Sequence, residues 1–392
     1  MSEAIKVVPE QINYLYPSTA KDLIGCEYRF ACKSDPDVKR YERGNTATAL
    51  GSVVHEIKDH LHKRKIFESG YVDEEFEELW ERLITDQYLS LKQEWDPSVV
   101  PKPNNWANYV WEKATTRKYV RDTLNTLDVT LGSLHEEEDE ELREREGRAS
   151  HEIPEDPQSM SYEQQLKNPV NADLSMYPDT EVELVDNEFM IRGEIDLIER
   201  SDNDDIYIID TKTGNVTEDN VEKHRIQLLL YAHLFFKKHE IWPRKLFIES
   251  KLGKRYELSY EVTEVQRLID DLILLRDSFN RKAGSATNDF QSNPSPELCK
   301  YCAFRIVCNS YWDALHDDWG HRDALMGKLS EDNQGPDKFE VLAPREGVYD
   351  TVSIAKMPAI QSESDKYIYI TKFQKKGNRI EPKWNTLARY SS

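Results

Sequence analysis

The sequence predicts an α/β fold with a mixed central sheet flanked by helices. Three strand signals follow one another from residue 181, as EVELV, MIRGEIDLIER and DIYIIDTKTGN, and the polar run Ser201-Asp202-Asn203-Asp204 is a turn between the last two. Two helical and two further strand patterns come next, in the ranges 219–238, 245–250, 255–260 and 262–282. Strands that alternate with helices in this way are typical of α/β domains.

Two helices are predicted ahead of these strands. A loop ends at Ser18 or Thr19, either of which is suited to cap a short helix that carries Cys26. From 46 to 67, apolar residues repeat at helical spacing, and His55 lies beside the apolar stripe. We therefore expect Cys26 on an ordered element and His55 at the edge of the core.

Other parts of the chain differ in character from this core. Residues 72–131 have a helical pattern rich in Trp and Tyr, whereas 135–178 are acidic, contain proline and predict a mobile, solvated insertion. The C-terminal segment reads as short strands and includes the hairpin DKYIYITKFQKKGNRIEPKW. We divide the chain into an N-terminal part of the core (1–66), a helical and acidic insertion (67–180), the rest of the core (181–315) and a small β-rich appendage (316–392).

Composition sets limits on function. A net charge of -21 argues against a nucleic-acid partner, but 18 acidic and four basic residues lie between Glu136 and Glu188, so most of that charge is confined to one segment. We find neither an apolar run long enough to span a membrane nor a signal peptide, and we expect a soluble, cytoplasmic protein without a membrane partner. The absence of a G-x-x-x-x-G-K-[ST] phosphate loop argues against an ATP-driven motor.

The central strands carry two carboxylates and a lysine. Asp196 and Asp210 fall on neighbouring predicted strands, and Lys212 follows Asp210 by two residues, so both of their side chains point to one face. Carboxylate oxygens are hard ligands suited to Mg²⁺ or Mn²⁺. Phosphodiester hydrolysis needs such a metal and a nearby cation. An isolated D-x-K can equally be a plain ion pair or a turn cap.

This D-x-K is not isolated, because further motifs precede and follow it along the chain. The order along the chain is Gly51-x-x-x-His55, Gly193-x-x-Asp196, Asp210-Thr211-Lys212 and Gln227-x-x-x-Tyr231. Gln227 and Tyr231 are four residues apart and share one helical face. For His55 alone, a structural histidine bonded to a backbone carbonyl is the competing interpretation.

These motifs, in this order, resemble those of RecB-type nucleases in the PD-(D/E)XK superfamily. The resemblance implies a restriction-endonuclease-like core and a metal-dependent deoxyribonuclease. It implies that the metal, Mg²⁺ or Mn²⁺, is bound by His55, Asp196, Asp210 and the backbone carbonyl of Thr211. It implies catalytic roles for Asp196, Asp210, Lys212, Gln227 and Tyr231.

The cysteines refine the resemblance. Cys26 precedes the motifs, whereas Cys299, Cys302 and Cys308 follow them at a spacing that matches common zinc fingers poorly. One cysteine before the motifs and three after them resembles the iron-sulfur branch, which includes CRISPR-associated RecB-like exonucleases, AddB and the exonuclease V group. This implies a structural [4Fe-4S] cluster that clasps the core. Cys32 has no counterpart, and we interpret it as a small buried side chain.

We expect an exonuclease that acts on single-stranded DNA or DNA ends in repair or recombination, with a helicase or a CRISPR integrase as a candidate partner. One alternative is a spacer-processing nuclease of CRISPR adaptation. Two others are a non-catalytic iron-sulfur module that binds DNA or a protein, and a structural zinc protein with a fortuitous D-x-K. Arg225 is the preferred phosphate contact, because it lies one turn from the predicted site.

Overall fold

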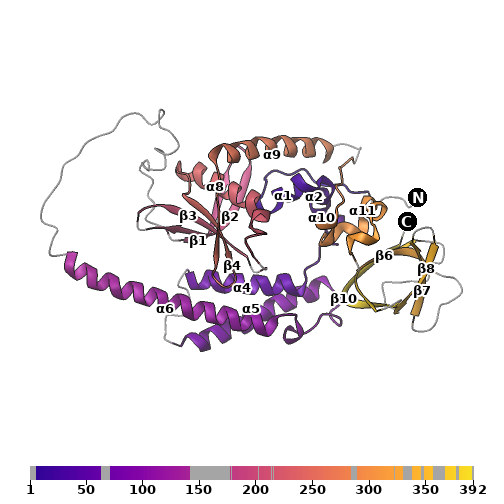
Figure 1. Cartoon of the computed structure of the whole chain (residues 1–392), viewed down its shortest axis with the longest axis horizontal. Coiled ribbons are helices and arrows are strands. Elements are labelled where there is room, and N and C mark those ends of the chain that lie inside the picture. The colour runs from indigo at the N-terminus through magenta and orange to yellow at the C-terminus, as the bar shows by residue number, and fades with distance from the viewer. Residues whose placement is uncertain are drawn as a thin grey trace.

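A five-stranded mixed sheet forms the centre of the core (Figure 1). The computed structural model describes residues 6–62, 71–141, 177, 179–201, 203–212, 214, 216–283, 289–321, 323–329, 338–345, 348–355, 367–376 and 379–390. In the sheet, the order is β1 (Asp179–Asp186), β2 (Ile191–Arg200), β3 (Ile206–Lys212), β4 (Lys245–Ser250) and β5 (Arg255–Leu258). Only β3 and β4 pair in parallel, and the other neighbours are antiparallel. The predicted mixed sheet is therefore present.

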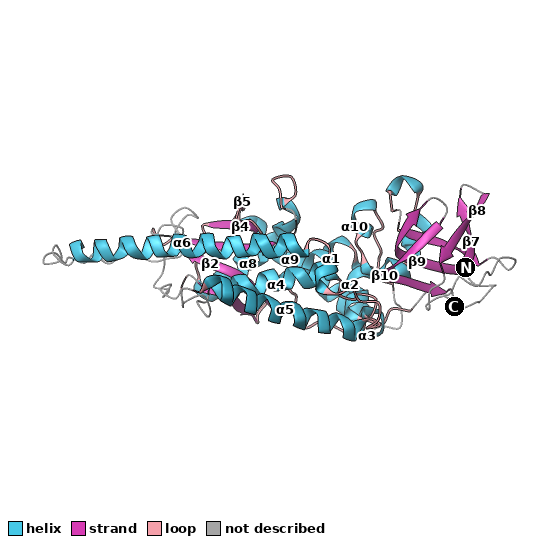
Figure 2. Ribbon diagram, turned by 90° about the horizontal axis from the view of Figure 1, so that it is seen from below, coloured by secondary structure: helices cyan, strands magenta, loops and turns pink. Residues whose placement is uncertain are grey.

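Helices cover both faces of this sheet (Figure 1). On one side lie α1 (Pro17–Gly25), α8 (Arg225–His239) and α9 (Val262–Ala283). On the other lies α4 (Thr46–His62), against which α5 (Val72–Glu94) and α6 (Tyr109–Glu141) pack (Figure 2). The helix α8 is buried almost all round, as its run of apolar residues requires, and it follows the short 3-10 turn η3 (Val221–His224).

The N-terminal helix differs from the prediction. Neither Ser18 nor Thr19 is its cap, because both lie inside α1, whose first residue is Pro17. The cap position is held by Tyr16, which has an extended backbone. Proline suits the first helical position, since its fixed φ matches the helix and its missing N–H is not needed there. The chain then breaks at Cys26, which has an extended backbone (φ -161°) and lies between α1 and α2 (Glu27–Ser34).

The predicted acidic insertion is largely outside the described residues. Its first part continues α6 as far as Glu141, so the helix extends beyond the predicted boundary at 135. Residues 142–176 and 178 are not among those that the structure describes. Short elements complete the chain: α3 (Pro36–Lys39), η1 (Pro103–Asn105), α10 (Pro296–Lys300), η4 (Ala303–Val307), α11 (Asn309–Ala314) and η5 (Asp317–Trp319).

The C-terminal strands form a closed five-stranded barrel beside the core (Figure 1). They are β6 (Ala324–Leu329), β7 (Lys338–Arg345), β8 (Val348–Ala355), β9 (Tyr367–Lys376) and β10 (Arg379–Tyr390), and the predicted hairpin is β9 with β10. The barrel order is β10-β8-β7-β6-β9, and β8 and β10 run parallel. Two aromatic contacts join barrel and core, Trp312 with Tyr369 and Trp95 with Trp384. In the described part of the chain, no helix is long and apolar enough to cross a membrane.

A close approach at Gly193 seats two helices on the sheet. A Cβ atom on this β2 residue would lie 2.9 Å from Cγ of Pro17 and 3.0 Å from Cδ1 of Leu234. Those atoms belong to α1 and α8, which both contact β2. Because real Cβ contacts are longer, only glycine allows both helices to pack here.

We expect Gly193→Ala to lower the free energy of unfolding by about 1–3 kcal/mol, the usual cost of overpacking. Thermal melting of the two proteins measures the effect. Gly214→Ala is the matched control, because no atom lies within 4 Å of a Cβ at that position. Equal melting temperatures for Gly193→Ala and wild type would contradict the account of this packing.

Candidate active site

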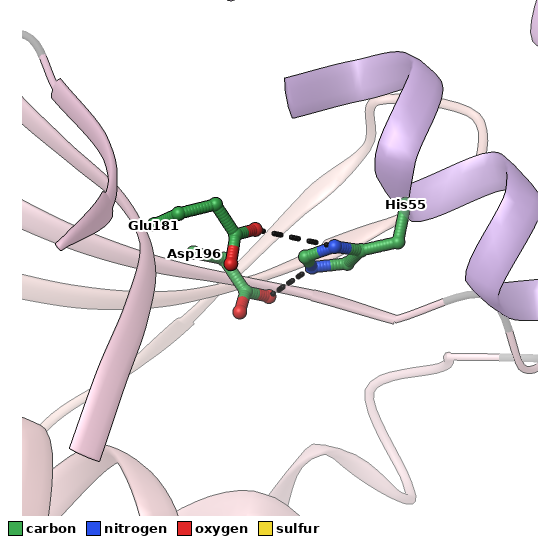
Figure 3. A group of neighbouring side chains, drawn as sticks. All are labelled: His55, Glu181 and Asp196. Carbon is green, nitrogen blue, oxygen red and sulfur yellow. Dashed lines mark ion pairs between the residues drawn. The ribbon is translucent and has the colours of Figure 1, made fainter. Parts of the chain in front are cut away.

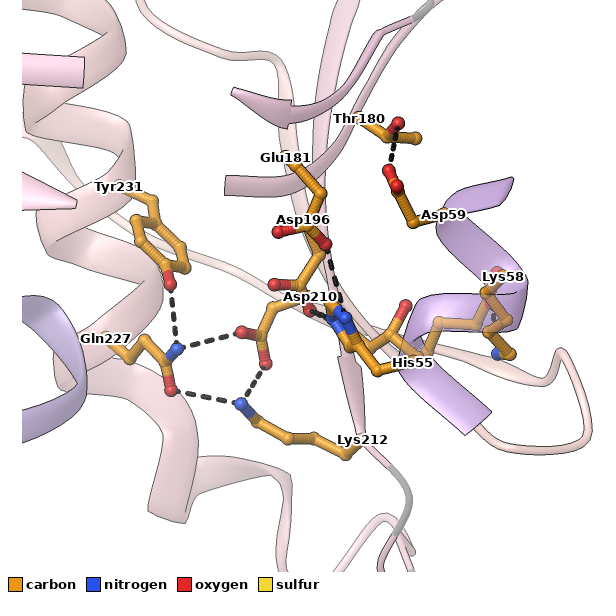
Figure 4. A network of polar contacts seen from close by, with 12 residues as sticks. His55, Lys58, Asp59, Thr180, Glu181, Asp196, Asp210, Lys212, Gln227 and Tyr231 are labelled. Atoms are coloured by element: carbon orange, nitrogen blue, oxygen red, sulfur yellow. Dashed lines mark hydrogen bonds and ion pairs between the residues drawn. The ribbon is translucent and has the colours of Figure 1, made fainter. Parts of the chain in front are cut away.

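Two side-chain contacts fix helix α4 against the sheet, and Figure 4 shows the one between Asp59 and Thr180. Lys58 Nζ lies 3.0 Å from Glu249 Oε1 of β4, and both side chains are buried. Thr180 of β1 donates its hydroxyl to Asp59 at 2.8 Å. A buried ion pair is costly to break from one side, so Lys58 sets the rotation of the helix. His55, one turn earlier, therefore faces β1 and β2.

The imidazole of His55 lies between two carboxylates (Figure 3). Its Nδ1 is 3.2 Å from Glu181 Oε1, and its Nε2 is 3.3 Å from Asp196 Oδ2. Glu181 comes from β1, where the pairing of Thr180 with Leu197 sets it opposite Asp196 of β2. Ligand atoms of the three residues all lie within 4.8 Å of one another.

A second carboxylate network adjoins this group (Figure 4). Asp210 is fully buried, and its Oδ2 lies 2.7 Å from Lys212 Nζ. Gln227 of α8 donates from Nε2 to Asp210 and to the Tyr231 hydroxyl, both at 2.9 Å, and its Oε1 accepts from Lys212 at 3.2 Å. The amide therefore holds Asp210 and Lys212 in fixed positions.

A backbone contact links the two networks. Thr211 donates its N–H to Asp196 Oδ2 at 2.6 Å. This bond joins β3 to the carboxylate of β2 and fixes the orientation of Asp196. The role of the Thr211 carbonyl as a metal ligand stays a prediction.

The electrostatics of this site favour a bound cation. Burial and the charge of Asp196 raise the pKa of Asp210 to about 7, against the attraction of Lys212. Burial and a bond to Glu194 raise the pKa of Glu181 to about 8. The bond to Asp196 raises the pKa of His55 to about 9. Crowded carboxylates cannot all ionise at neutral pH without positive charge among them.

The donor set fits a divalent metal. Carboxylate oxygens and one imidazole suit Mg²⁺ or Mn²⁺, and a doubly charged ion would relieve the repulsion that raises these pKa values. The side chains of Asp196, Glu181 and His55 are 17%, 21% and 33% exposed, so a substrate can reach them. The residues that would hold the ion are His55, Glu181 and Asp196, with Asp210 beside them.

Two further basic side chains influence the surroundings of Lys212. Burial lowers the pKa of Lys21 on α1, and the charge of Lys212 lowers it further against the attraction of Asp22. Burial lowers the pKa of His224 to about 4, and the charges of Lys212 and Lys21 add to that shift. Because a pKa near 4 leaves His224 neutral at pH 7, only Lys21 can add to the positive potential of Lys212.

Arg225 is less suited to phosphate than the sequence suggests. Its Nε donates to Glu222 at 2.7 Å, and its Nη1 donates to Glu264 at 3.0 Å. Its Nη2 donates to the Ser259 carbonyl at 3.1 Å. A phosphate could contact Arg225 only by replacing these bonds, which disfavours the contact. The DNA contact at Arg225 stays a prediction.

The segments that carry the cysteines lie side by side, at the beginning and the end of the core. Tyr28, two residues after Cys26, donates its N–H to the Gln291 carbonyl at 2.9 Å, and its hydroxyl donates to the Val307 carbonyl at 3.2 Å. Burial raises the pKa of Cys308 to about 12, and the charges of the other three predicted ligands add to the rise. The four thiols therefore lie near one another. Cys32 is fully buried, as expected.

Comparisons with known proteins agree with this geometry. The family model for the PD-(D/E)XK nuclease superfamily matches residues 15–309. The chain belongs to this nuclease superfamily. The matched range includes all the motif residues and the four cysteines, and it ends before the barrel.

Individual relatives of this superfamily member are distant. The CRISPR-associated exonuclease Cas4 of Saccharolobus solfataricus is 27% identical over 154 residues, which are 38% of this chain and 67% of the relative. The solved structure of SSO0001 is 25% identical, with a TM-score of 0.22, over 34% of this chain and 61% of that one. A candidate exonuclease from Eubacterium rectale is 10% identical, with a TM-score of 0.34, over 78% and 89% of the two chains.

Within this nuclease, three residues of the site were missed at the level of sequence. Glu181 could be found only from the β1–β2 register and from its left-handed backbone, with φ at 51°. Lys21 of α1 lies far from the motifs along the chain, whereas His224 of η3 precedes Gln227 by three residues. The sequence offers no spacing that connects them with Lys212.

We expect the metal to bind more tightly as pH rises. Folding raises the pKa of Asp210, Glu181 and His55 above their ordinary values of 3.8, 4.5 and 6.5, so these groups stabilise the metal-free protein at low pH. That stabilisation is lost between about pH 4 and 9 as they deprotonate. A dication needs the deprotonated ligands, so the rise in melting temperature with Mn²⁺ should be larger at about pH 9 than at about pH 6.

Asp196→Asn is the control for this experiment. It removes one ligand charge, and the Mn²⁺-dependent rise in melting temperature should become small at both pH values. A rise that is the same at both pH values, or the same in the variant, would show that the ion binds elsewhere.

Proposed function

We propose that this nuclease is a Mg²⁺- or Mn²⁺-dependent deoxyribonuclease that degrades single-stranded DNA from an end. The observation that carries the proposal is the contact of a three-ligand group, His55, Glu181 and Asp196, with the Asp210–Lys212–Gln227 network. The first group is suited to a metal, and the second supplies a fixed cation beside it. Repair and recombination are the processes that require such trimming of DNA ends.

Each side chain has a defined part in this reaction. A bound divalent cation supplies a Lewis acid that lowers the pKa of water and neutralises charge on the phosphate. Lys212 Nζ, held by Asp210 and Gln227, places a positive charge where the transition state is most negative. Tyr231 fixes the amide of Gln227 and thereby the direction in which Lys212 points.

Lys212→Ala should lower the rate of DNA cleavage about 10²–10³-fold, the cost of losing one preorganised electrostatic contact. Single-stranded DNA labelled at its 5′ or its 3′ end measures the rate, and the two ladders give the polarity. Lys238→Ala is the matched control, because Lys238 is exposed on α8 and has no part in the network.

Two results would count against the assignment. Cleavage by Lys212→Ala at the wild-type rate would remove the lysine from the reaction. A folded wild-type protein that binds DNA with Mn²⁺ but never cleaves it would support the non-catalytic module instead.

The proposal includes a structural [4Fe-4S] cluster on Cys26, Cys299, Cys302 and Cys308. Four cysteine thiolates are the ligands that such a cluster takes, and the spacing of the last three cysteines matches common zinc fingers poorly. The cluster closes a loop of more than 270 residues, which is worth roughly 5 kcal/mol of chain entropy.

Cys302→Ala should remove the brown colour and the absorbance near ~400 nm of such a cluster, and it should lower the melting temperature. Cys32→Ala is the control, because Cys32 is a buried neighbour that we leave out of the ligand set. A variant Cys302→Ala that keeps both the absorbance and the melting temperature would refute the clasp.

A second candidate function is spacer processing in CRISPR adaptation. It is favoured by the match to a relative named as a CRISPR-associated exonuclease. In that case an integrase would be the partner, whereas a repair nuclease would pair with a helicase. The match covers 38% of the chain, so we rank repair first.

A further inference from the structure

A pocket outside the active site lies between the barrel and the core. Its cavity has a volume of about 570 Å³. Its lining comes from the start of α4 and the loop before it, the cysteine loop at the end of α10, the segment just before β6, and the barrel strands β9 and β10. None of the proposed ligands of the divalent cation and none of the catalytic residues lines this pocket, although the proposed cluster ligand Cys302 does.

Positive charge dominates the pocket. Arg43, Lys300, Arg305 and Lys372 line it, against the two carboxylates Glu42 and Asp323. Both carboxylates already have partners, since Glu42 pairs with Lys33 and Asp323 pairs with Arg305. Within the described parts of the chain, no carboxylate forms an ion pair with Arg43, Lys300 or Lys372. In a chain with a net charge of -21, such a concentration of unpaired cations points to an anionic ligand.

The floor of the pocket is built from a buried guanidinium. Arg305 is only 3% exposed, and its Nη1 donates to the Lys300 carbonyl at 3.2 Å. Its Nη2 contacts Asp323, while its Nε is buried without a partner. Burying an arginine is costly, and here it fixes the loop that carries Lys300.

Lys372 is held in a strained conformation at the opposite wall. Its φ of 64° lies in the left-handed region, which a lysine rarely adopts. Two bonds hold this backbone, from the Lys372 N–H to the Asp323 carbonyl at 2.9 Å and from the Thr386 hydroxyl to the Lys372 carbonyl at 2.8 Å. Strain that the surroundings enforce is typical of a functional position.

An exposed aromatic ring completes the pocket. Tyr301 lines it and is 83% exposed. Lys300 Nζ lies over the Tyr301 ring, 5.3 Å from its centre, so a cation and an exposed aromatic ring are neighbours. Phosphate-binding cations next to exposed aromatic rings are the two components with which proteins hold single strands.

The barrel has a connectivity known from nucleic-acid binding. Its first strand β6 pairs with the second and the fourth strands, β7 and β9, and its third strand β8 pairs in parallel with the fifth, β10. This five-stranded Greek-key barrel has the topology of the OB-fold, which binds oligonucleotides in many proteins. A fold topology alone does not assign a function, so binding is inferred here from the residues that line the pocket.

Helix α4 connects the pocket with the active site. Gly44 and Asn45, just before α4, line the pocket, and His55 lies nine residues after the start of the helix at Thr46. At 1.5 Å per residue this is about 14 Å. One strand can therefore contact both places.

We propose that this pocket is a second binding site, which holds a single-stranded polynucleotide about 14 Å along α4 from the cleavage site. The cations contact its phosphates, and Tyr301 stacks on a base. Binding at this pocket does not depend on catalysis; only the assignment of the bound strand as the one cleaved rests on the proposed function.

The test measures binding of labelled single strands of about 20 nucleotides in EDTA, where no metal supports cleavage. Lys300→Gln combined with Tyr301→Ala should weaken binding of oligo(dT) about 5- to 100-fold, through the loss of one stacking contact and one phosphate contact. Lys372→Gln, in the barrel, should reduce the slope of log K against log salt by about 0.7. A merely structural role would not change that slope.

Three controls sharpen the result. Lys238→Gln removes an equal charge from an exposed position on α8 and should bind as wild type. Tyr301→Phe keeps the ring and should retain most of the affinity. Melting curves identify any variant that has lost its fold, and Lys372→Gln tests the pocket independently of the cysteine loop.

The outcomes separate this proposal from the proposed function. Wild-type affinity and salt slope in both pocket variants would overturn the proposal, whatever the protein cleaves. Equal weakening for a duplex of the same length would also overturn it, because the surface would then be a general phosphate site. Binding of oligo(rU) shows whether the pocket distinguishes ribose from deoxyribose. If the pocket variants lose affinity for RNA and DNA equally, the pocket accepts either kind of single strand.

Discussion

Crowding of negative charge at one point in the core is the constraint on which this structure depends. Glu181, Asp196 and Asp210 come from three consecutive strands and meet around His55 and Lys212. Asp210 is fully buried, so its ionisation is costly and its pKa rises to about 7. A fold that brings such groups together loses stability, which is acceptable where function requires it.

The surrounding architecture keeps that arrangement in place. The glycine at 193 lets α1 and α8 pack against β2, and the ion pair between Lys58 and Glu249 holds α4 on the other face. Contacts between the segments around Cys26 and Cys308 then join the beginning of the core to its end. The active site, the cysteine loop and the barrel pocket each adjoin α1 or α4. These two helices therefore set the positions of the three sites relative to one another.

The sequence predicts the parts of the site that depend on local periodicity. Alternation along β2 and β3 predicts that Asp196 and Asp210 lie on neighbouring strands, and a spacing of two predicts that Lys212 shares the face of Asp210. Glu181 was missed because its position depends on strand register and on a left-handed backbone. The barrel was predicted only as short strands with one hairpin, since closure and the β8–β10 pairing depend on contacts distant in sequence.

The central claim is that the crowded carboxylates form a metal site, and the most direct test is the position of a bound ion. Diffraction from crystals soaked in Mn²⁺, collected where manganese scatters anomalously, locates that ion without reference to activity. We expect an anomalous peak between His55, Glu181 and Asp196, next to Asp210. A fully soaked crystal with no peak there, or with its strongest peak at another site, would contradict the account.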